Sequence, residues 1–306
     1  MKLTDLRKIA AAAAFIGFTA FAVMSCGDKK EAKSQEAAAS QENAENQEEA
    51  VEIKIVKTKD PNPSTDFIYE TTVDGTGVVI QKYIGSRGNV IIPEEIEGLK
   101  VKTIGAGSFQ ELKNIASVSL PAFVKSIEAS AFRNSSLSEV TLNSGLQTIA
   151  ASAFRGSKLK SVEIPAGFEK FTGGYQFYES ALEKVSIPQG LASIPEGCFA
   201  STKLSSVEFP EGIVSIADSA FSDCEISSFN IPSSLKSTGS KAFSGNPLKE
   251  VSIAARTAPV TYGWNTFADC NGKGTMTIAL RKSINSSGYR NTYYEKDVSG
   301  CWEPKK

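Results

Sequence analysis

Apolar positions return along this chain with a fixed period. A phenylalanine closes each repeat, and the steps between successive closing phenylalanines are 22 to 24 residues. A period of this length that persists over more than half of a chain is typical of a solenoid, in which each repeat packs only against its neighbours. The closing residues are Phe109, Phe132, Phe154, Phe177, Phe199, Phe221, Phe243 and Phe267.

Within a repeat, apolar residues stand at offsets +5, +8, +10, +14, +17, +21 and +22 from the preceding phenylalanine. The alternation at +8 and +10 predicts a short strand, which a proline ends in most repeats. The +14 and +17 positions fit either a second short strand or a turn. Stacked repeats would align these side chains into columns, so we expect the phenylalanines to form a core. After Phe199 the apolar residues are Leu204, Val207, Phe209, Ile213, Ile216, Ala220 and Phe221.

Five segments follow from this pattern and from its margins. We expect a signal peptide at 1–25, a lipidated cysteine and disordered tether at 26–63, an N-terminal β cap with the first strand at 64–105, the solenoid at 106–278 and a C-terminal cap at 279–306. The cap at 64–105 is expected to be out of register with the repeat until Val90.

Bulges are expected where the repeat departs from its pattern. The departures are Asn143 in place of proline, Thr238 in place of isoleucine, the insertion at 256–264, and the repeat from Phe154 to Phe177 with Phe168, Phe171 and Tyr175.

The N-terminus carries an export signal. Lys2, Arg7 and Lys8 precede an apolar run over 9–24, which is the order of a secretory signal peptide. The sequence at 23–26, Val-Met-Ser-Cys, resembles a bacterial lipobox, and that resemblance implies cleavage before Cys26 and attachment of lipid to it. An uncleaved anchor or an ordinary secretory signal remains the alternative. The polar, acidic composition of the following residues predicts a disordered tether.

The amino-acid composition limits the kinds of catalytic site, metal site and partner that we expect. The chain has no histidine, which removes the commonest general base and the usual zinc ligand. No C-x-x-C pair occurs, so no metal site, cofactor or catalytic residue is predicted. A net charge of -1 without a basic block argues against nucleic acid as a partner.

Four of the five cysteines fall in or after the repeats. Cys198 takes a position held elsewhere by alanine and is expected in the core. Cys224 and Cys270 occupy the +3 position, where serine, threonine and asparagine predict a polar column at the turn. The sequence leaves open whether Cys270 pairs with Cys301.

The repeats, with their V-x-I-P and I-x-x-x-A-F signatures, resemble the BspA-type leucine-rich repeat family of bacterial surface proteins. The resemblance covers roughly 78–278 in about eight repeats. It implies an all-β-rich leucine-rich repeat solenoid with two caps. Together with the lipobox, it implies a surface lipoprotein of the kind found in spirochaetes and Bacteroides-like bacteria. Members of the family are often adhesins that bind host matrix proteins or other bacteria.

The outward side chains of the +7 to +9 strands form the candidate binding face, which we call the strand face. It is small, polar and mildly acidic, and it lacks the Trp, Tyr and Arg that dominate interface hot spots. Either it is a docking strip or it is simply a solvated sheet face. Tyr175, Tyr178, Tyr262 and Trp264 are expected to fill the core at bulges rather than anchor a partner. The candidate binding residues are Glu139, Thr141, Glu163, Lys184, Ser186, Glu208, Asn230 and Glu250.

These features predict a non-enzymatic, lipid-anchored binding protein of the cell envelope, at the outer membrane or cell surface. It would be an adhesin or interaction module whose strand face binds a protein ligand, either from a host matrix or from another bacterium. The alternative is a periplasmic-facing scaffold with an envelope partner. A carboxylate enzyme is disfavoured, because Glu163 and Glu208 would lie about 10 Å apart on an open sheet.

Overall fold

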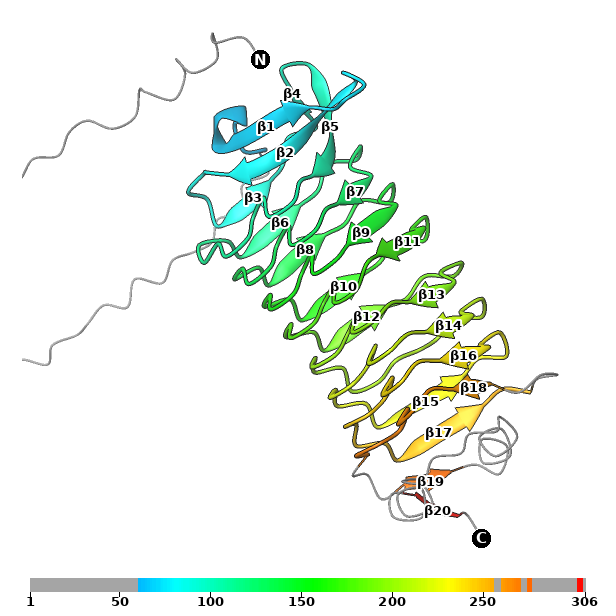
Figure 1. The fold of residues 1–306 in the computed structure, drawn as a ribbon. Helices are drawn as coiled ribbons and strands as arrows, with labels where there is room; N and C mark the ends of the chain where they lie inside the picture. Colours follow the sequence, from blue (N-terminus) through cyan, green and yellow to red (C-terminus); the bar gives the residue numbers. More distant parts are fainter. Residues whose placement is uncertain (1–59, 256–259, 271–273, 277–301, 305–306) are drawn as a thin grey trace, which may run out of the picture. The chain divides into compact units, whose positions relative to one another are not determined.

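The structure, a computed structural model, describes residues 60–255, 260–270, 274–276 and 302–304. All of these residues belong to one compact unit, Ile55–Lys306. A 3-10 turn at Ser64–Asp66 precedes the strands, and no α-helix occurs among the described residues. The chain winds as a β-solenoid whose turns stack in sequence order (Figure 1).

Every described turn except the one between Phe199 and Phe221 contributes a first strand, which lies at the V-x-I signature or its apolar equivalent. The register is parallel and places Val118 beside Val140, Val162 beside Val185 and Phe229 beside Val251, as the column at +8 predicts. The first strands are β3 (Asn89–Ile91), β6 (Ser117–Ser119), β8 (Glu139–Thr141), β10 (Ser161–Glu163), β12 (Lys184–Ser186), β15 (Ser228–Ile231), β17 (Glu250–Ile253) and β19 (Gly274–Met276), which pairs with β20 (Trp302–Pro304).

A second strand follows in each turn and resolves the alternative at +17, since these residues form strands. Ile127, Ile149 and Phe171 stand in one parallel register, as do Ile194, Ile216 and Thr238. The second strands are β2 (Gly77–Tyr83), β5 (Leu99–Ile104), β7 (Ser126–Ile127), β9 (Thr148–Ala150), β11 (Lys170–Thr172), β13 (Ser193–Ile194), β14 (Ser215–Ile216), β16 (Ser237–Thr238) and β18 (Thr261–Tyr262).

The N-terminal end is closed by antiparallel pairing. β1 (Phe67–Thr71) pairs with β2, and β4 (Glu95–Ile96) pairs with β5. β2 itself runs parallel to β5 and sets Ile80 beside Ile104, so it already occupies the second-strand position. The expectation that the register begins only at Val90 is therefore wrong, because the array starts one strand earlier.

A ladder of stacked aromatic rings runs through the core. Each closing phenylalanine is stacked on the next, and Tyr83 extends the ladder at its N-terminal end. Centroid separations range from 4.9 Å between Phe109 and Phe132 to 5.8 Å between Phe243 and Phe267. These distances match the spacing of paired strands, about 4.8 Å, with a slight tilt of the rings. The phenylalanines are core residues, as predicted.

Two columns of left-handed backbone flank the ring ladder. The residues two before and two after each closing phenylalanine have positive φ, for example Ser219 at 53° and Asp223 at 55° around Phe221. Glycine fills some of these positions, but serine, lysine, asparagine and tyrosine fill others. Because this conformation opposes the Cβ of an L-residue, every turn carries some backbone strain. The stacking of the rings and the hydrogen bonds between turns offset this strain.

The repeat from Phe154 to Phe177 departs from the pattern after β11. An extra residue in the 172–174 bend interrupts the pairing of second strands, so that β11 and β13 belong to different sheets. Thr238, in contrast, stands in register between Ile216 and Tyr262, and the bulge expected there is absent. The insertion at 256–264 is described only from residue 260 onward. Of the predicted C-terminal cap, only Trp302–Pro304 lies among the described residues.

Candidate functional site

The strand face is formed by the outward side chains of β8, β10, β12, β15 and β17, together with residues 206–208 of the intervening turn. The inward side chains of these strands pack into the core, as Val162 and Val251 do. All eight candidate residues named from the sequence are exposed. The alternation of the strands therefore places every one of them on this face.

The charge on the strand face is mainly negative. Four of the eight candidates are glutamates and one is Lys184. None of the ion pairs among the described residues includes any of them. Where polar side chains meet, they form short ladders, as when Ser252 Oγ donates to Asn230 Oδ1 at 2.8 Å. The face thus offers carboxylates and amide groups to a partner.

Two interruptions divide the first strands into three sheets. β8 and β10 are not paired, and between β12 and β15 the only pairing is the bridge from Ser206 to Ser228. A shallow hollow lies at each interruption. The two hollows bring together four of the candidate residues in pairs: Thr141 with Glu163, and Glu208 with Asn230.

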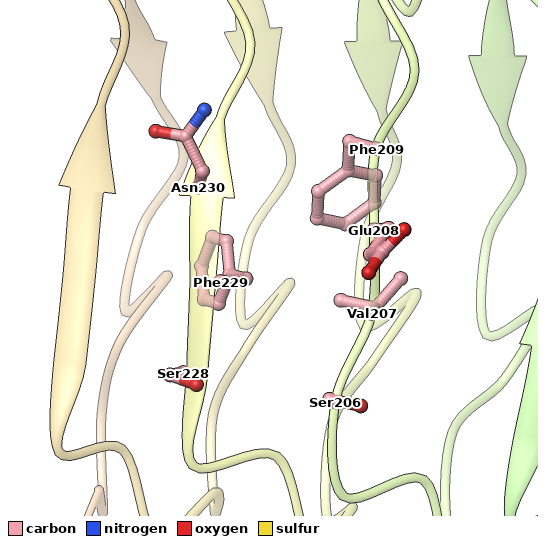
Figure 2. A pocket seen from close by; sticks show the side chains of 7 residues that line it. All are labelled: Ser206, Val207, Glu208, Phe209, Ser228, Phe229 and Asn230. Atoms are coloured by element: carbon pink, nitrogen blue, oxygen red, sulfur yellow. The ribbon is translucent and has the colours of Figure 1, made fainter.

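The hollow between residues 206–209 and β15 has a volume of about 370 Å³. Figure 2 shows that its labelled side chains come from these two neighbouring segments. Phe209 occupies a column that elsewhere holds isoleucine or leucine, and Phe229 a column that elsewhere holds valine in most turns. The Phe229 ring stacks on Phe243 at 4.4 Å, and the Phe209 ring meets the Phe221 ring edge-on at 5.5 Å. The larger rings take up space between the turns, which accounts for the open surface above them.

The hollow between β8 and β10 has a volume of about 470 Å³ and is open to solvent. Asn143 lies beside it, in the position that proline takes in most repeats. Its side-chain amide donates to the carbonyl oxygens of Ala122 at 2.8 Å and Val124 at 2.9 Å, which holds the turn to its predecessor. The hollow is lined by Val140, Thr141, Leu142, Ser144, Glu163, Pro165 and Ala166.

Glu163 and Glu208 belong to different hollows, so the structure does not bring these two carboxylates into one site. Among the described residues, no three Cys, Asp or Glu side chains gather in a group that could hold a metal ion. The arrangement can donate and accept hydrogen bonds and can attract positive charge. Both are binding functions.

The polar column predicted at +3 is present and buried. Five of its seven members bond the carbonyl oxygens of closing phenylalanines: Thr202 Oγ1 donates to Phe199 O at 2.8 Å, and Asn246 Nδ2 donates to Phe221 O at 2.7 Å. The hydroxyls of Ser157 and Ser180 make no such bond. Such bonds satisfy backbone groups that the turn leaves unpaired. The column comprises Ser135, Ser157, Ser180, Thr202, Cys224, Asn246 and Cys270.

The cysteines of the solenoid are structural. Cys198 lies in the core, as predicted, and burial raises the pKa of its thiol well above the usual range. Burial likewise raises the pKa of Cys224 to about 11. Thiols of this kind are poor nucleophiles. Cys301 lies outside the described residues, so its pairing with Cys270 stays a prediction.

The aromatic residues of the irregular repeats do not share one role. Tyr262 is buried, as expected, but Trp264 is 54% exposed and Tyr175 is 37% exposed. The prediction that these two fill the core is wrong. Phe168 and Phe171 do so instead, with ring centroids 4.8 Å apart. The position of Tyr175, two residues before a closing phenylalanine, is the signal that places it at the surface.

The described residues include no helix of sufficient length and apolar character to span a bilayer. Cys26 and residues 27–59 of the expected tether lie outside the described residues, and lipidation stays a prediction. Residues 60–63, the end of the expected tether, are described, and Asn62 among them is buried and bonded to Ile91.

Comparison with known proteins agrees with this fold. The chain is similar to a solved leucine-rich repeat protein of Treponema pallidum at 25% identity and a TM-score of 0.54, over 76% of this chain and 97% of that one. It is also similar to a leucine-rich repeat protein of Bacteroides ovatus at 20% identity and a TM-score of 0.47, over 69% of each chain. No curated protein sequence matches.

Repeats of one family account for most of the solenoid. The BspA type leucine rich repeat region matches residues 102–175 and 170–295 in six copies. These ranges contain the stacked phenylalanines, most of both strand columns and all eight candidate residues. The chain therefore belongs to the BspA-type leucine-rich repeat family.

Proposed function

We propose that this protein is a non-enzymatic binding protein of the bacterial cell envelope that docks a protein ligand on its strand face. The observation that carries the proposal is the row of eight exposed candidate side chains, with a hollow at each of two interruptions. Membership of a family of surface proteins with leucine-rich repeats supports a role in protein interaction. The excess of glutamate on the face favours a partner with a basic surface.

The proposal includes anchoring through lipid on Cys26 and display at the outer surface. The lipobox-like sequence at 23–26 supports anchoring, and the polar segment after it would lift the folded unit away from the bilayer. Incorporation of labelled palmitate that disappears in Cys26→Ala tests anchoring. Digestion of intact cells with protease tests display, and survival of the protein until the envelope is broken would contradict it.

Docking on the strand face is tested by photo-crosslinking in whole cells. A photoreactive amino acid replaces Thr141 or Asn230, one beside each hollow, and Lys236 serves as the matched exposed position beside the second strands. We expect one adduct from both strand-face positions and none from Lys236, because a docked ligand would span the hollows. The adduct should weaken in Glu163→Gln and Glu208→Gln and at high salt. Equal yields from all three positions would contradict docking on this face.

The identity of the crosslinked protein separates the two envelope roles. A host or foreign protein supports an adhesin. An envelope protein of the same cell, combined with resistance to external protease, supports a periplasmic-facing scaffold instead.

A further inference from the structure

A cluster of aromatic and charged side chains lies at the turn that follows β11, away from the strand face. We call it the tyrosine edge, and it consists of Arg155, Tyr175, Tyr178, Glu179 and Glu196. The two tyrosine rings meet edge to face, with centroids 5.6 Å apart and planes at 84°. The Arg155 guanidinium lies 4.7 Å above the Tyr178 ring and pairs with Glu179 at 3.4 Å. The Tyr175 hydroxyl donates a hydrogen bond to the carboxylate of Glu196.

Tyr175 has an unusual backbone for an aromatic residue. Its φ is 64°, in a column where most other turns place glycine, serine or asparagine. A bulky residue in this conformation is rare, and such outliers cluster at functional sites. The ring packs over Gly197, where a Cβ atom would lie 2.3 Å from Tyr175 Cε1. One side of the ring therefore rests on backbone, and 37% of the residue remains exposed.

A buried glutamine side chain stabilises the bend that precedes Tyr175. Gln176 is fully buried, and its side-chain amide donates to the carbonyl oxygens of Thr172 at 3.3 Å and Gly173 at 3.2 Å. These bonds fix the inserted residues, and Glu196 fixes the tyrosine hydroxyl. A ring that is held in place before binding loses little entropy when a ligand stacks on it.

The charges of the cluster select the ligand. Glu179 is already paired with Arg155, so Glu196, which accepts the hydrogen bond of the Tyr175 hydroxyl, supplies the remaining carboxylate of the cluster. The hydrogen bond to this carboxylate raises the pKa of Tyr175, so the phenol stays neutral at physiological pH. A guanidinium group fits a neutral tyrosine ring that lies next to a carboxylate. Its flat face stacks on aromatic rings, and the N–H groups at its edge pair with carboxylates.

We propose that the tyrosine edge binds an arginine side chain of a partner protein, with the guanidinium stacked on Tyr175 and paired with Glu196. This inference rests on the proposed function, since it presumes a protein ligand. It adds an anchor point of the residue type that dominates interface hot spots, which the strand face lacks. A ligand could contact both regions or the tyrosine edge alone.

The experiment uses the full chain in detergent, with ¹³C-labelled tyrosine rings. The ring signals are assigned with Tyr175→Phe and Tyr178→Phe and titrated with the peptide acetyl-Gly-Arg-Gly-amide. We expect saturable shifts of the Tyr175 and Tyr178 signals. The citrulline counterpart, which is neutral and nearly isosteric, should produce none. Glu196→Gln should weaken binding roughly fivefold, whereas Glu225→Gln, an exposed residue in a later turn, should leave it unchanged.

A second variant removes the ring without straining the backbone. Tyr175→Gly suits the positive φ, so the protein should fold and lose the response of Tyr178 to the arginine peptide. Equal shifts with the arginine and citrulline peptides would overturn the proposal. So would a response to chito-oligosaccharide without one to arginine, which would indicate a glycan site.

Docking on the strand face and arginine binding at the tyrosine edge can be contradicted independently of each other. Crosslinks from Thr141 and Asn230 without an arginine response would remove the tyrosine edge and leave docking on the strand face. An arginine response without those crosslinks would leave the tyrosine edge as the docking site.

Discussion

Single residues matter most in the ring ladder, because each ring is shared by two neighbouring turns. Phe199 is fully buried between Phe177 at 5.4 Å and Phe221 at 5.2 Å. Its backbone amide also bonds the carbonyl oxygen of Ala220 in the next turn at 2.9 Å. Removing the ring therefore opens a cavity between turns that no single repeat can close.

Phe199→Ala should lower the free energy of unfolding by about 3–5 kcal/mol, since it removes a large buried side chain and leaves a cavity. Urea unfolding followed by circular dichroism measures the loss. The control is Phe123→Ala, where the ring is 42% exposed and lies beneath the Lys100 ammonium, and which should cost less than about 1 kcal/mol. A similar loss in both variants would contradict a core role for the ladder.

At the scale of elements, the strands are too short to be stable alone. Most have two to four residues, so each depends on the pairing that its neighbours provide. Side-chain size decides where this pairing continues. It is complete between Phe229 and Val251 but reduced to a single bridge beside Phe209. The hollow beside Phe209 is thus a product of the packing beneath it.

Phe209→Ile tests this relation, because isoleucine is the residue found at this position in most other repeats. The smaller side chain should let residues 207–209 pair with β15 and should close the hollow. Amide hydrogen exchange at residues 207–209 should slow by at least about tenfold, a gain of roughly 1.4 kcal/mol in local stability. Unchanged or faster exchange would show that the interruption has another cause.

Periodicity was sufficient to predict most of the fold. The columns at +5 to +22 correspond to buried positions, and the candidate residues of the strand face are exposed because strands alternate. The register of β2 with the repeat was missed because Tyr83, not phenylalanine, closes it and no I-x-x-x-A-F signature precedes it. The left-handed columns were missed because serine and lysine occupy positions where glycine would have been a signal. The period predicts neither the hollows nor the exposure of Tyr175. The hollow beside Phe209 depends on side-chain volume, and the exposure of Tyr175 depends on one inserted residue.

At the scale of the whole folded unit, stability is a sum over neighbouring turns, and the ends are the weakest points. The N-terminal end of the first strands is closed by Asn62, which is only 2% exposed. Its backbone amide donates to Ile91 O at 2.8 Å, and its side-chain oxygen accepts from the Ile91 amide at 2.9 Å. Asn62 thereby satisfies the open edge of β3 with one backbone bond and one side-chain bond.

Asn62→Ala should cost about 1–3 kcal/mol, because it leaves the partly buried Ile91 amide without its acceptor. Exchange of that amide should accelerate more than exchange in β15, since the damage begins at the N-terminal end. Asn114→Ala, at an exposed position, is the matched control and should have little effect. Uniform acceleration in β3 and β15 would instead indicate that the array unfolds all at once.

Asn62 also determines how the folded unit meets mechanical load. Among the described residues, a pull from the N-terminal side acts at Asn62 on the two bonds to Ile91. These bonds lie at the edge of the stack, where tension separates one turn from the next and does not load all turns in parallel. Under hydrodynamic drag the turns would unfold one after another from the N-terminal end. The folded unit would therefore absorb work over a long extension before its last turn unfolded.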